Sequence, residues 1–196
     1  MHWDRMFEDL EGQLAAEWEA ERAVLDAESE RLRISKLSLR ARLRALAQAE
    51  ASVGIRLRGG LRRTVRITMM GADWFAVRET TDRQVMIVPL SALTTVATDH
   101  GALLGSLAED TASVEDVRGR MSFGFLLRDL ARRRVPVHLT LIDGDLVHGT
   151  IDRAGEDHLD IAVHDAGQAR RASAVSAFHM VPFEAVVLLR ADARIT

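Results

Sequence analysis

The chain contains an internal duplication, and this repeat limits its architecture more than any other feature of the sequence. Residues 38–79 align with residues 122–163 without a gap, and eleven of the 42 aligned positions are identical. A second match follows, Val88–Leu93 against Val181–Val186, with nine extra residues between the two matches in the second copy. A repeated unit defines where the domains lie and what each contains. The repeat therefore predicts two similar small domains.

Each copy reads as a short helix followed by five short strands. The helices are expected at 38–50 and 122–134, with a serine at the start of each as a plausible N-cap. Asp143-Gly144 is a strong hairpin signal, because glycine readily adopts positive φ. Closure into a barrel is how five short strands avoid exposed edges. The expected strands are 53–58, 61–69, 73–79, 84–88 and 91–97 in the first copy, and in the second Val137–Leu141, 145–153, Leu159–Val163, 174–181 and 184–190.

Residues 2–34 predict one long amphipathic helix ahead of the repeat. Its apolar side chains recur at spacings of three, four and seven, which places them on one face. A seven-residue spacing, which is typical of a coiled-coil seam, continues into the first copy through Trp18, Leu25, Leu32, Leu39 and Leu46. The second position of the heptad that a coiled coil needs to be apolar is, however, mostly Glu, Ser or Arg. Two interpretations remain open: a helix packed on its own barrel, or a helix that dimerises or binds a partner. The apolar face consists of Trp3, Phe7, Leu10, Leu14, Trp18 and Leu25.

Composition excludes several classes of protein. With 47% apolar residues in 196, the chain is expected to fold. It has no cysteine, which excludes disulfides, a thiolate nucleophile and a cysteine-ligated zinc. It shows neither an apolar run of about 18 residues nor a signal peptide, so we expect a soluble cytoplasmic protein without a membrane span. Lys36 is the only lysine among 26 basic residues, which with abundant alanine suggests a bacterial source with a high-GC genome.

The net charge of −3 hides a strong asymmetry along the chain. Residues 1–34 carry a net charge of −6, whereas residues 35–68 carry +8. If the apolar residues of the first two strands face the core, the alternating arginines face outward and would attract phosphates. The alternatives are that the acidic helix folds back onto this face, or that an acidic protein or membrane surface binds it. The candidate nucleic-acid-binding arginines are Arg56, Arg58, Arg62, Arg63 and Arg66.

Histidines are concentrated in the second copy, which holds five of the seven. Strand alternation places His158, Asp160 and His164 on one outward stripe. However, His158 and His164 would lie about 20 Å apart, too far to share one ion. We therefore expect surface histidines and no metal site.

Signals of catalysis are nearly absent. The sequence has no glycine-rich phosphate loop, no HExxH and no notable Ser/His/Asp arrangement. Small barrels also offer little concave volume for a pocket. We expect no enzymatic activity, no catalytic residues, no cofactor and no small-molecule substrate.

The second copy resembles the Sm-like (LSm, Hfq-like) family. The resemblance lies in the segment from Val137 to Gly144 and in the segment from Gly149 to Asp165, each following the short helix. It covers about residues 122–190, and residues 38–97 mostly through the internal repeat. Other SH3-like barrels, including the PRC-barrel group, use similar Val-Pro-Leu turns and remain an alternative. The resemblance implies two tandem five-stranded barrels.

Family knowledge also implies specific site positions. Sm-like proteins that bind RNA stack a base on a side chain at the start of the third strand, and an Asn two residues later reads the base. The stacking positions correspond to Trp74 and His158, both usable platforms. The reading positions correspond to Ala76 and Asp160, which do not match the Asn, and the family's Arg-Gly before the last strand is replaced by Val-Pro in both copies.

Sm-like proteins form rings by pairing the fourth strand of one barrel with the fifth strand of the next. The resemblance therefore implies an assembly, either between the two copies of one chain or among several chains.

The expected fold is thus α+β, with a long N-terminal helix followed by two tandem Sm-like barrels. The expected segments are the acidic helix at 1–37, the first barrel at 38–97, a linker at 98–121 and the second barrel at 122–192. The expected function is a non-enzymatic scaffold that binds itself or another protein through the N-terminal helix and the barrel edges. The alternative is binding of RNA or single-stranded DNA through the arginines, Trp74 and His158.

Overall fold

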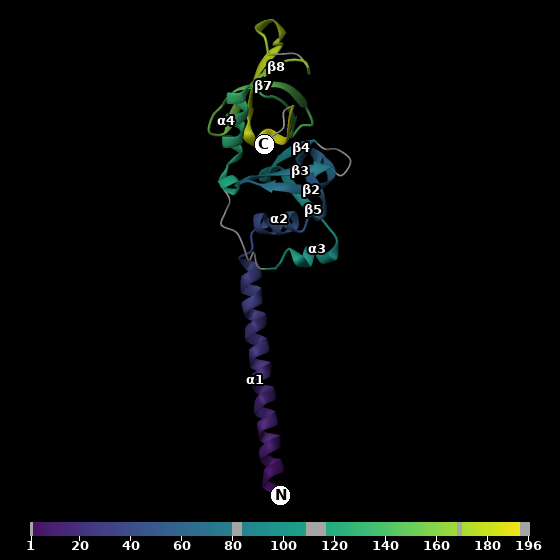
Figure 1. The fold of residues 1–196 in the computed structure, drawn as a ribbon, viewed down its shortest axis with the longest axis vertical. Helices are drawn as coiled ribbons and strands as arrows, with labels where there is room; N and C mark the ends of the chain where they lie inside the picture. Colours follow the sequence, from purple (N-terminus) through teal and green to yellow (C-terminus); the bar gives the residue numbers. More distant parts are fainter. Residues whose placement is uncertain (1, 80–83, 109–116, 168–169, 193–196) are drawn as a thin grey trace. The chain divides into compact units, whose positions relative to one another are not determined.

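The computed structural model describes residues 2–79, 84–108, 117–167 and 170–192, with side chains described from residue 11 onward except at 117–118. The chain divides into two compact units, residues 1–39 and residues 40–196 (Figure 1). The first unit is essentially one helix, and the second contains all ten strands.

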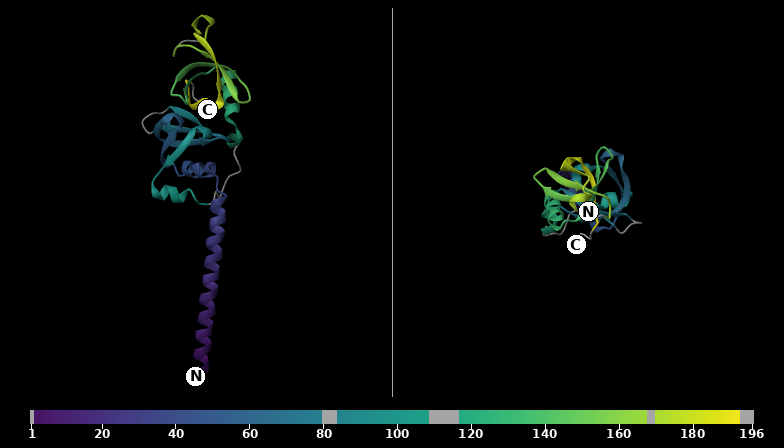
Figure 2. Two further views of the ribbon diagram at one scale, coloured as in Figure 1. Left: turned by 180° about the vertical axis from the view of Figure 1, so that it is seen from behind. Right: turned by 90° about the horizontal axis from the view of Figure 1, so that it is seen from above.

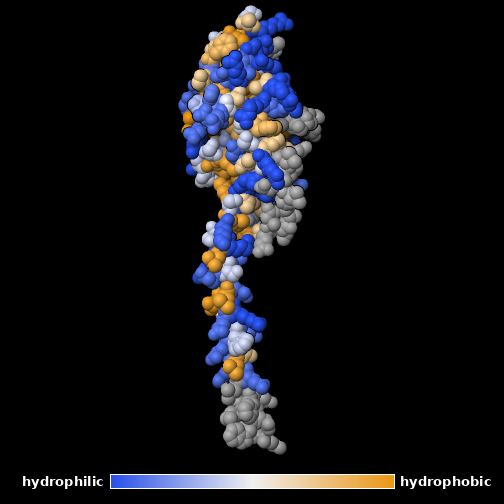
Figure 3. Space-filling view, turned by 90° about the vertical axis from the view of Figure 1, so that its left-hand side faces the viewer, coloured by the Kyte–Doolittle hydropathy of each residue, from blue (hydrophilic) through white to orange (hydrophobic). Residues whose placement is uncertain are grey.

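Helix α1 spans His2–Ser35, so the predicted N-terminal helix is confirmed. Ion pairs one turn apart, such as Arg33 with Glu30 at 2.6 Å, support it along its polar surface. Its apolar side chains Leu14, Trp18 and Leu25 are 50%, 64% and 68% exposed. On the face drawn in Figure 3, the apolar residues of α1 appear as separate patches among hydrophilic ones. The predicted partner-binding residues Trp3, Phe7 and Leu10 lie outside the described side chains.

The second unit is built on one antiparallel sheet of ten strands. Helix α2 (Leu39–Gln48) precedes the first five strands, and helix α4 (Phe123–Arg133) precedes the other five (Figures 1 and 2). The first five strands are β1 (Ser52–Leu57), β2 (Arg62–Met70), β3 (Trp74–Glu79), β4 (Val85–Pro89) and β5 (Leu93–Ala97). The second five are β6 (Pro136–Leu141), β7 (Leu146–Ala154), β8 (His158–Val163), β9 (Ala177–Pro182) and β10 (Val186–Ala191).

The strand order of the first half is repeated in the second. The first half runs β5-β1-β2-β3-β4 and the second runs β10-β6-β7-β8-β9. Strand β4 does not return to pair with β5 of its own half but pairs with β10 of the other half. The strand pattern predicted two separately closed barrels, whereas the structure has one open sheet with β5 and β9 at its ends. The free edge of β4 is satisfied by a strand of the second copy instead of by closure.

The two halves also share their apolar cores. Val187 and Leu188 of β10 pack in the cluster formed mainly by the first half. Conversely, Trp74 and Ile87 of the first half belong to the cluster formed mainly by the second half. Because β10 contributes to both clusters, the halves are joined by side-chain packing as well as by strand pairing.

In the second copy, the helix ends and the hairpin turn lie where the local sequence pattern predicted them. The Ser122 hydroxyl accepts the N–H of Phe125, which makes it the N-cap of α4 as predicted. Helix α4 ends at Arg133, and the C-cap residue Arg134 has a left-handed φ of 55°. Glu50, at the equivalent position after α2, has a φ of 49°. Gly144 has a φ of 94° in the predicted hairpin turn.

The segment expected as a linker contains a helix. Helix α3 spans His100–Gly105, and the Asp99 side chain accepts the N–H of Ala102 at its start. The two glycines of this helix made the segment look like a loop in the sequence, because glycine is a poor helix former. Residues 109–116 lie outside the described part of the chain.

Candidate functional site

The outward side of the first half carries a cluster of arginines. Arg56 of β1 lies opposite Arg62 of β2, and Arg66 of β2 lies opposite Arg78 of β3. All four side chains are exposed and lie on the side of the sheet opposite the buried Ile55, Val65 and Val77. We call Arg56, Arg62, Arg66 and Arg78 the arginine face. The sequence pattern identified three of them and missed Arg78, which the sheet brings in from a later strand.

Electrostatics make the arginine face unusual. Like charges placed directly opposite each other on a sheet are destabilising. Among the described residues, no carboxylate forms an ion pair with any of these four guanidinium groups. The face therefore presents concentrated positive charge that an anion would relieve.

Two further predicted arginines have different surroundings. Arg63 lies opposite Ile55, on the side of the sheet that carries the core, and its Nε is 2.9 Å from Glu79 Oε1. It is therefore neutralised and separated from the arginine face. Arg58 lies in the turn after β1 and is exposed.

The prediction that Trp74 of the first copy is a stacking platform is wrong. Trp74 is only 1% exposed, and its indole N–H donates to the Met121 carbonyl at 2.8 Å. The ring lies against Gly71, where any side chain would collide with it. A buried ring cannot stack on a base. His158, the equivalent residue of the second copy, is 42% exposed and lies 2.8 Å from the Asp157 carboxylate, so it remains accessible.

An acidic groove is lined by Asp73 and Asp157, the residues that precede Trp74 and His158. It has a volume of about 610 Å³ and is lined by equivalent turns of both halves, including the Val-Pro turns. Among the described residues, its lining contains no Lys or Arg, and phosphates would be repelled from it. Its carboxylates are Asp73, Glu156, Asp157 and Glu184.

Strand β9 forms an apolar free edge. Within the described strands, β9 pairs only with β8, and Phe178 and Met180 are 69% and 73% exposed. The equivalent of Met180 in the first copy is Ile87 of β4, which is 1% exposed because β10 lies beside it. The exposed apolar residues of β9 thus occupy positions that a neighbouring strand covers in β4.

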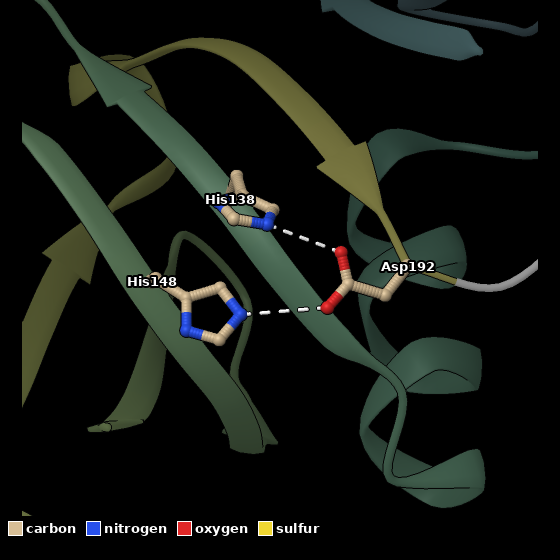
Figure 4. A group of neighbouring side chains, drawn as sticks. All are labelled: His138, His148 and Asp192. Carbon is tan, nitrogen blue, oxygen red and sulfur yellow. Dashed lines mark hydrogen bonds and ion pairs between the residues drawn. The ribbon is translucent and has the colours of Figure 1, made fainter. Parts of the chain in front are cut away.

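A cluster of two histidines and an aspartate lies in the second half (Figure 4). His138 of β6 and His148 of β7 lie directly opposite each other, and Asp192 follows β10. Nε2 of His138 is 3.1 Å from Asp192 Oδ1, and Nε2 of His148 is 3.4 Å from Asp192 Oδ2. Burial lowers the pKa of His138 below its ordinary value, and His148 lowers it further, while Asp192 opposes the shift.

The strand pattern grouped histidines that do not lie together in the structure. It placed His164 on an outward stripe with His158, but His164 is 3% exposed and lies beyond the end of β8. The useful signal was the Asp143-Gly144 turn: His138 and His148 are equally far from residue 143, and residues equidistant from a tight turn face each other.

A chain of hydrogen bonds through His164 and Thr150 orients the His148 ring. Nδ1 of His148 lies 2.7 Å from the His164 carbonyl oxygen, which can only accept, so Nδ1 carries the proton. The same reasoning applies to His164, whose Nδ1 donates to the Asp165 carbonyl at 3.1 Å. Its Nε2 then accepts the Thr150 hydroxyl at 2.9 Å. These bonds hold the His148 ring with its Nε2 toward Asp192.

Comparisons of the chain with protein-family models, curated proteins and solved structures found no match. Among the described residues, no helix combines the length and apolar character needed to cross a membrane.

Proposed function

We propose that the chain is a non-enzymatic scaffold protein, built from two Sm-like halves, that assembles with further copies of itself. The observation that carries the proposal is the pairing of β4 with β10. It joins the fourth strand of one copy to the fifth strand of the other, which is the contact that the resemblance implies.

The same contact can be repeated between chains. Strand β9 is the equivalent of β4, strand β5 is the equivalent of β10, and these two strands end the sheet. Pairing β9 of one chain with β5 of the next would therefore reuse the geometry already present inside each chain. Such a head-to-tail contact generates rings or filaments.

The composition of the two edges favours pairing. Proteins that avoid edge-to-edge contacts usually place charged residues, above all lysine, on their edge strands. Neither β5 nor β9 contains Asp, Glu, Lys or Arg. Phe178 and Met180 add exposed apolar area that a second chain would cover.

The test is the mass of the full chain in solution, measured by light scattering over a range of concentrations. We expect an assembly larger than one chain, and we expect Phe178→Lys combined with Met180→Lys to reduce it to single chains. Leu146→Lys is the matched control, because Leu146 is 76% exposed but does not lie on an edge strand. A wild-type chain that stays monomeric at all concentrations would overturn the proposal.

A mixing experiment tests the direction of pairing. A chain with Thr95→Lys and Ala97→Lys carries a blocked β5, and the double variant above carries a blocked β9. Head-to-tail pairing predicts that each variant is monomeric alone and that an equimolar mixture forms a two-chain complex. If the chain with the blocked β5 still dimerises alone, β9 pairs with β9 instead.

A second candidate function is binding of RNA or single-stranded DNA, and the observation that favours it is the arginine face. Its four guanidinium groups lie on adjacent strands without carboxylate partners among the described residues, and the acidic groove is an unsuitable alternative site. Nucleic-acid affinity from such a face depends steeply on salt.

Fluorescence anisotropy with a short labelled oligonucleotide tests this candidate. Arg62→Glu combined with Arg66→Glu should strongly weaken binding, and each lost phosphate contact should reduce the logarithmic salt slope by about 1. Arg171→Glu is the control, because Arg171 is an exposed arginine of the second half. Equal binding by wild type and the double variant would exclude the arginine face.

A further inference from the structure

We infer that His138, His148 and Asp192 form a binding site for a divalent transition-metal ion, with Zn²⁺ as the best match. The site would lie in the second half only, and it is independent of the proposed self-assembly.

The distances fit one ion. Each of the three residues offers one ligand atom, and these atoms all lie within 4.8 Å of one another. Ligand atoms placed about 2.0 Å from a tetrahedral Zn²⁺ are about 3.3 Å apart. The His138 Nε2 atom lies 3.1 Å from Asp192 Oδ1 and the His148 Nε2 atom lies 3.4 Å from Asp192 Oδ2, so whichever carboxylate oxygen binds the ion, one imidazole nitrogen is already close to that separation from it.

Hydrogen bonding leaves the right atom free on His148. Because its Nδ1 donates to the His164 carbonyl, the neutral ring presents an unprotonated Nε2 to Asp192. In this tautomer two acceptors face each other, and the shared cation between them is either a proton or a metal ion. Metal-ligating histidines typically donate their other ring N–H to a backbone carbonyl in this way.

The donor set selects the type of ion. Two imidazoles and one carboxylate suit Zn²⁺, Ni²⁺ or Co²⁺, whereas Ca²⁺ and Mg²⁺ prefer oxygen ligands alone. Three protein ligands leave a further position for water or another small ligand. Asp192 is 36% exposed, so an ion can reach the site from solvent. Arg190 lies opposite His138, and its positive charge repels a cation at this site. We therefore expect weaker metal binding than at a closed four-ligand site.

The first copy shows that the fold does not require these residues. The repeat aligns His138, His148 and Asp192 with Gly54, Thr64 and Asp99. Gly54 and Thr64 are opposite each other in the same register, and the Asp99 side chain caps α3 instead. A sheet of the same order is thus built without the two imidazoles, which suggests a role beyond folding.

Titration calorimetry with Zn²⁺ on the chelator-treated full chain tests the site. We expect one ion per chain, and at least a tenfold loss of affinity in His138→Gln, in His148→Gln and in Asp192→Asn. His179→Gln is the control, because His179 is an exposed histidine of β9 that has no part in the cluster. Absence of saturable binding, or equal binding by all variants, would overturn the inference.

Spectroscopy of the wild-type chain gives a readout that does not depend on the folding of variants. Added Co²⁺ should give the visible absorption of a tetrahedral nitrogen and oxygen site. It should also broaden the ring resonances of His138 and His148 selectively in NMR spectra, leaving those of His158 and His179 sharp. Uniform broadening of all histidines, or none, would contradict a site at this cluster and leave His148 paired with Asp192 through a proton alone.

Discussion

Ile87 of β4 lies directly opposite Leu189 of β10, and this antiparallel contact connects the two copies of the repeat. Both side chains are fully buried, at 1% and 0% exposure, in the same apolar cluster. The two halves therefore depend on each other for both backbone pairing and core packing.

Replacing Leu189 with alanine should lower the free energy of unfolding by about 2–5 kcal/mol, because it leaves a cavity in the shared core. Hydrogen exchange should show that amides of β1–β2 and β7–β8 lose protection together. Leu146→Ala, at an exposed position, should change stability by no more than about 0.5 kcal/mol. Independent loss of protection in the two halves would contradict the shared core.

Gly71→Ala should destabilise the protein more than Gly155→Ala, although the two glycines are equivalent in the repeat. A methyl group at Gly71 would strike the Trp74 ring, which is buried and hydrogen-bonded. A methyl group at Gly155 would meet the His158 ring, which is exposed enough to move. Urea denaturation should show a loss of about 1–3 kcal/mol for Gly71→Ala and less for Gly155→Ala. Equal losses would mean that the Trp74 ring moves as easily as the His158 ring.

Asp152 should make stability depend on pH in acid. Burial would raise its pKa, but the hydrogen bond from Arg170 at 2.5 Å and the charges of Arg170 and Arg134 lower it below the ordinary value of 3.8. Because the folded-state pKa lies below that of the unfolded chain, its stabilisation is present above pH 3.8 and is lost as pH falls through the folded-state pKa. Asp152→Asn should therefore lower stability by about 1 kcal/mol at pH 7.

The difference between wild type and Asp152→Asn should shrink as pH falls below 3.8, as measured by urea denaturation at pH 7 and pH 3. Asp145→Asn serves as the comparison, since Asp145 lies exposed in the β6–β7 turn without an ion pair among the described residues. A constant difference at both pH values would show that the Asp152 carboxylate is not the source of the effect.

Arg134→Gly should be more stable than Arg134→Ala by about 1 kcal/mol. Both changes remove the ion pair with Asp152 at 2.7 Å, but only glycine adopts the left-handed φ of 55° without strain. Glu50, at φ 49° after α2, should give the same preference for glycine over alanine. Thermal unfolding of the four variants measures both differences, and a preference for alanine at either position would exclude left-handed strain there.

Local patterns of the sequence were sufficient for much of the fold. The helical periodicity predicted α1, the serine before Phe123 marked the start of α4, and Asp143-Gly144 marked a hairpin turn. Strand alternation also placed Arg56 and Arg66 outward. Each of these features depends on residues within a few positions of one another, and so it can be read without knowing the tertiary structure.

The remaining features depend on contacts between distant segments. The indole N–H of Trp74 donates to the carbonyl of Met121, which lies 47 residues later, and the ring packs among apolar residues of the second half. Asp192 meets His148 from 44 residues away. Local periodicity carries no information about such pairs. The burial of Trp74, which the resemblance implied to be a stacking platform, and the contact of Asp192 with His148 therefore could not be read from local patterns.

By itself the sequence determined that the chain is duplicated, that a helix precedes five short strands in each copy, and that the copies differ on their outer faces. Only the tertiary structure decided that β4 pairs with β10, so that one open sheet with free edges at β5 and β9 replaces two closed barrels. The physical reason is that any strand edge offers the same backbone donors and acceptors. The choice between closing on its own half and joining the other half depends on how β10 fills both cores.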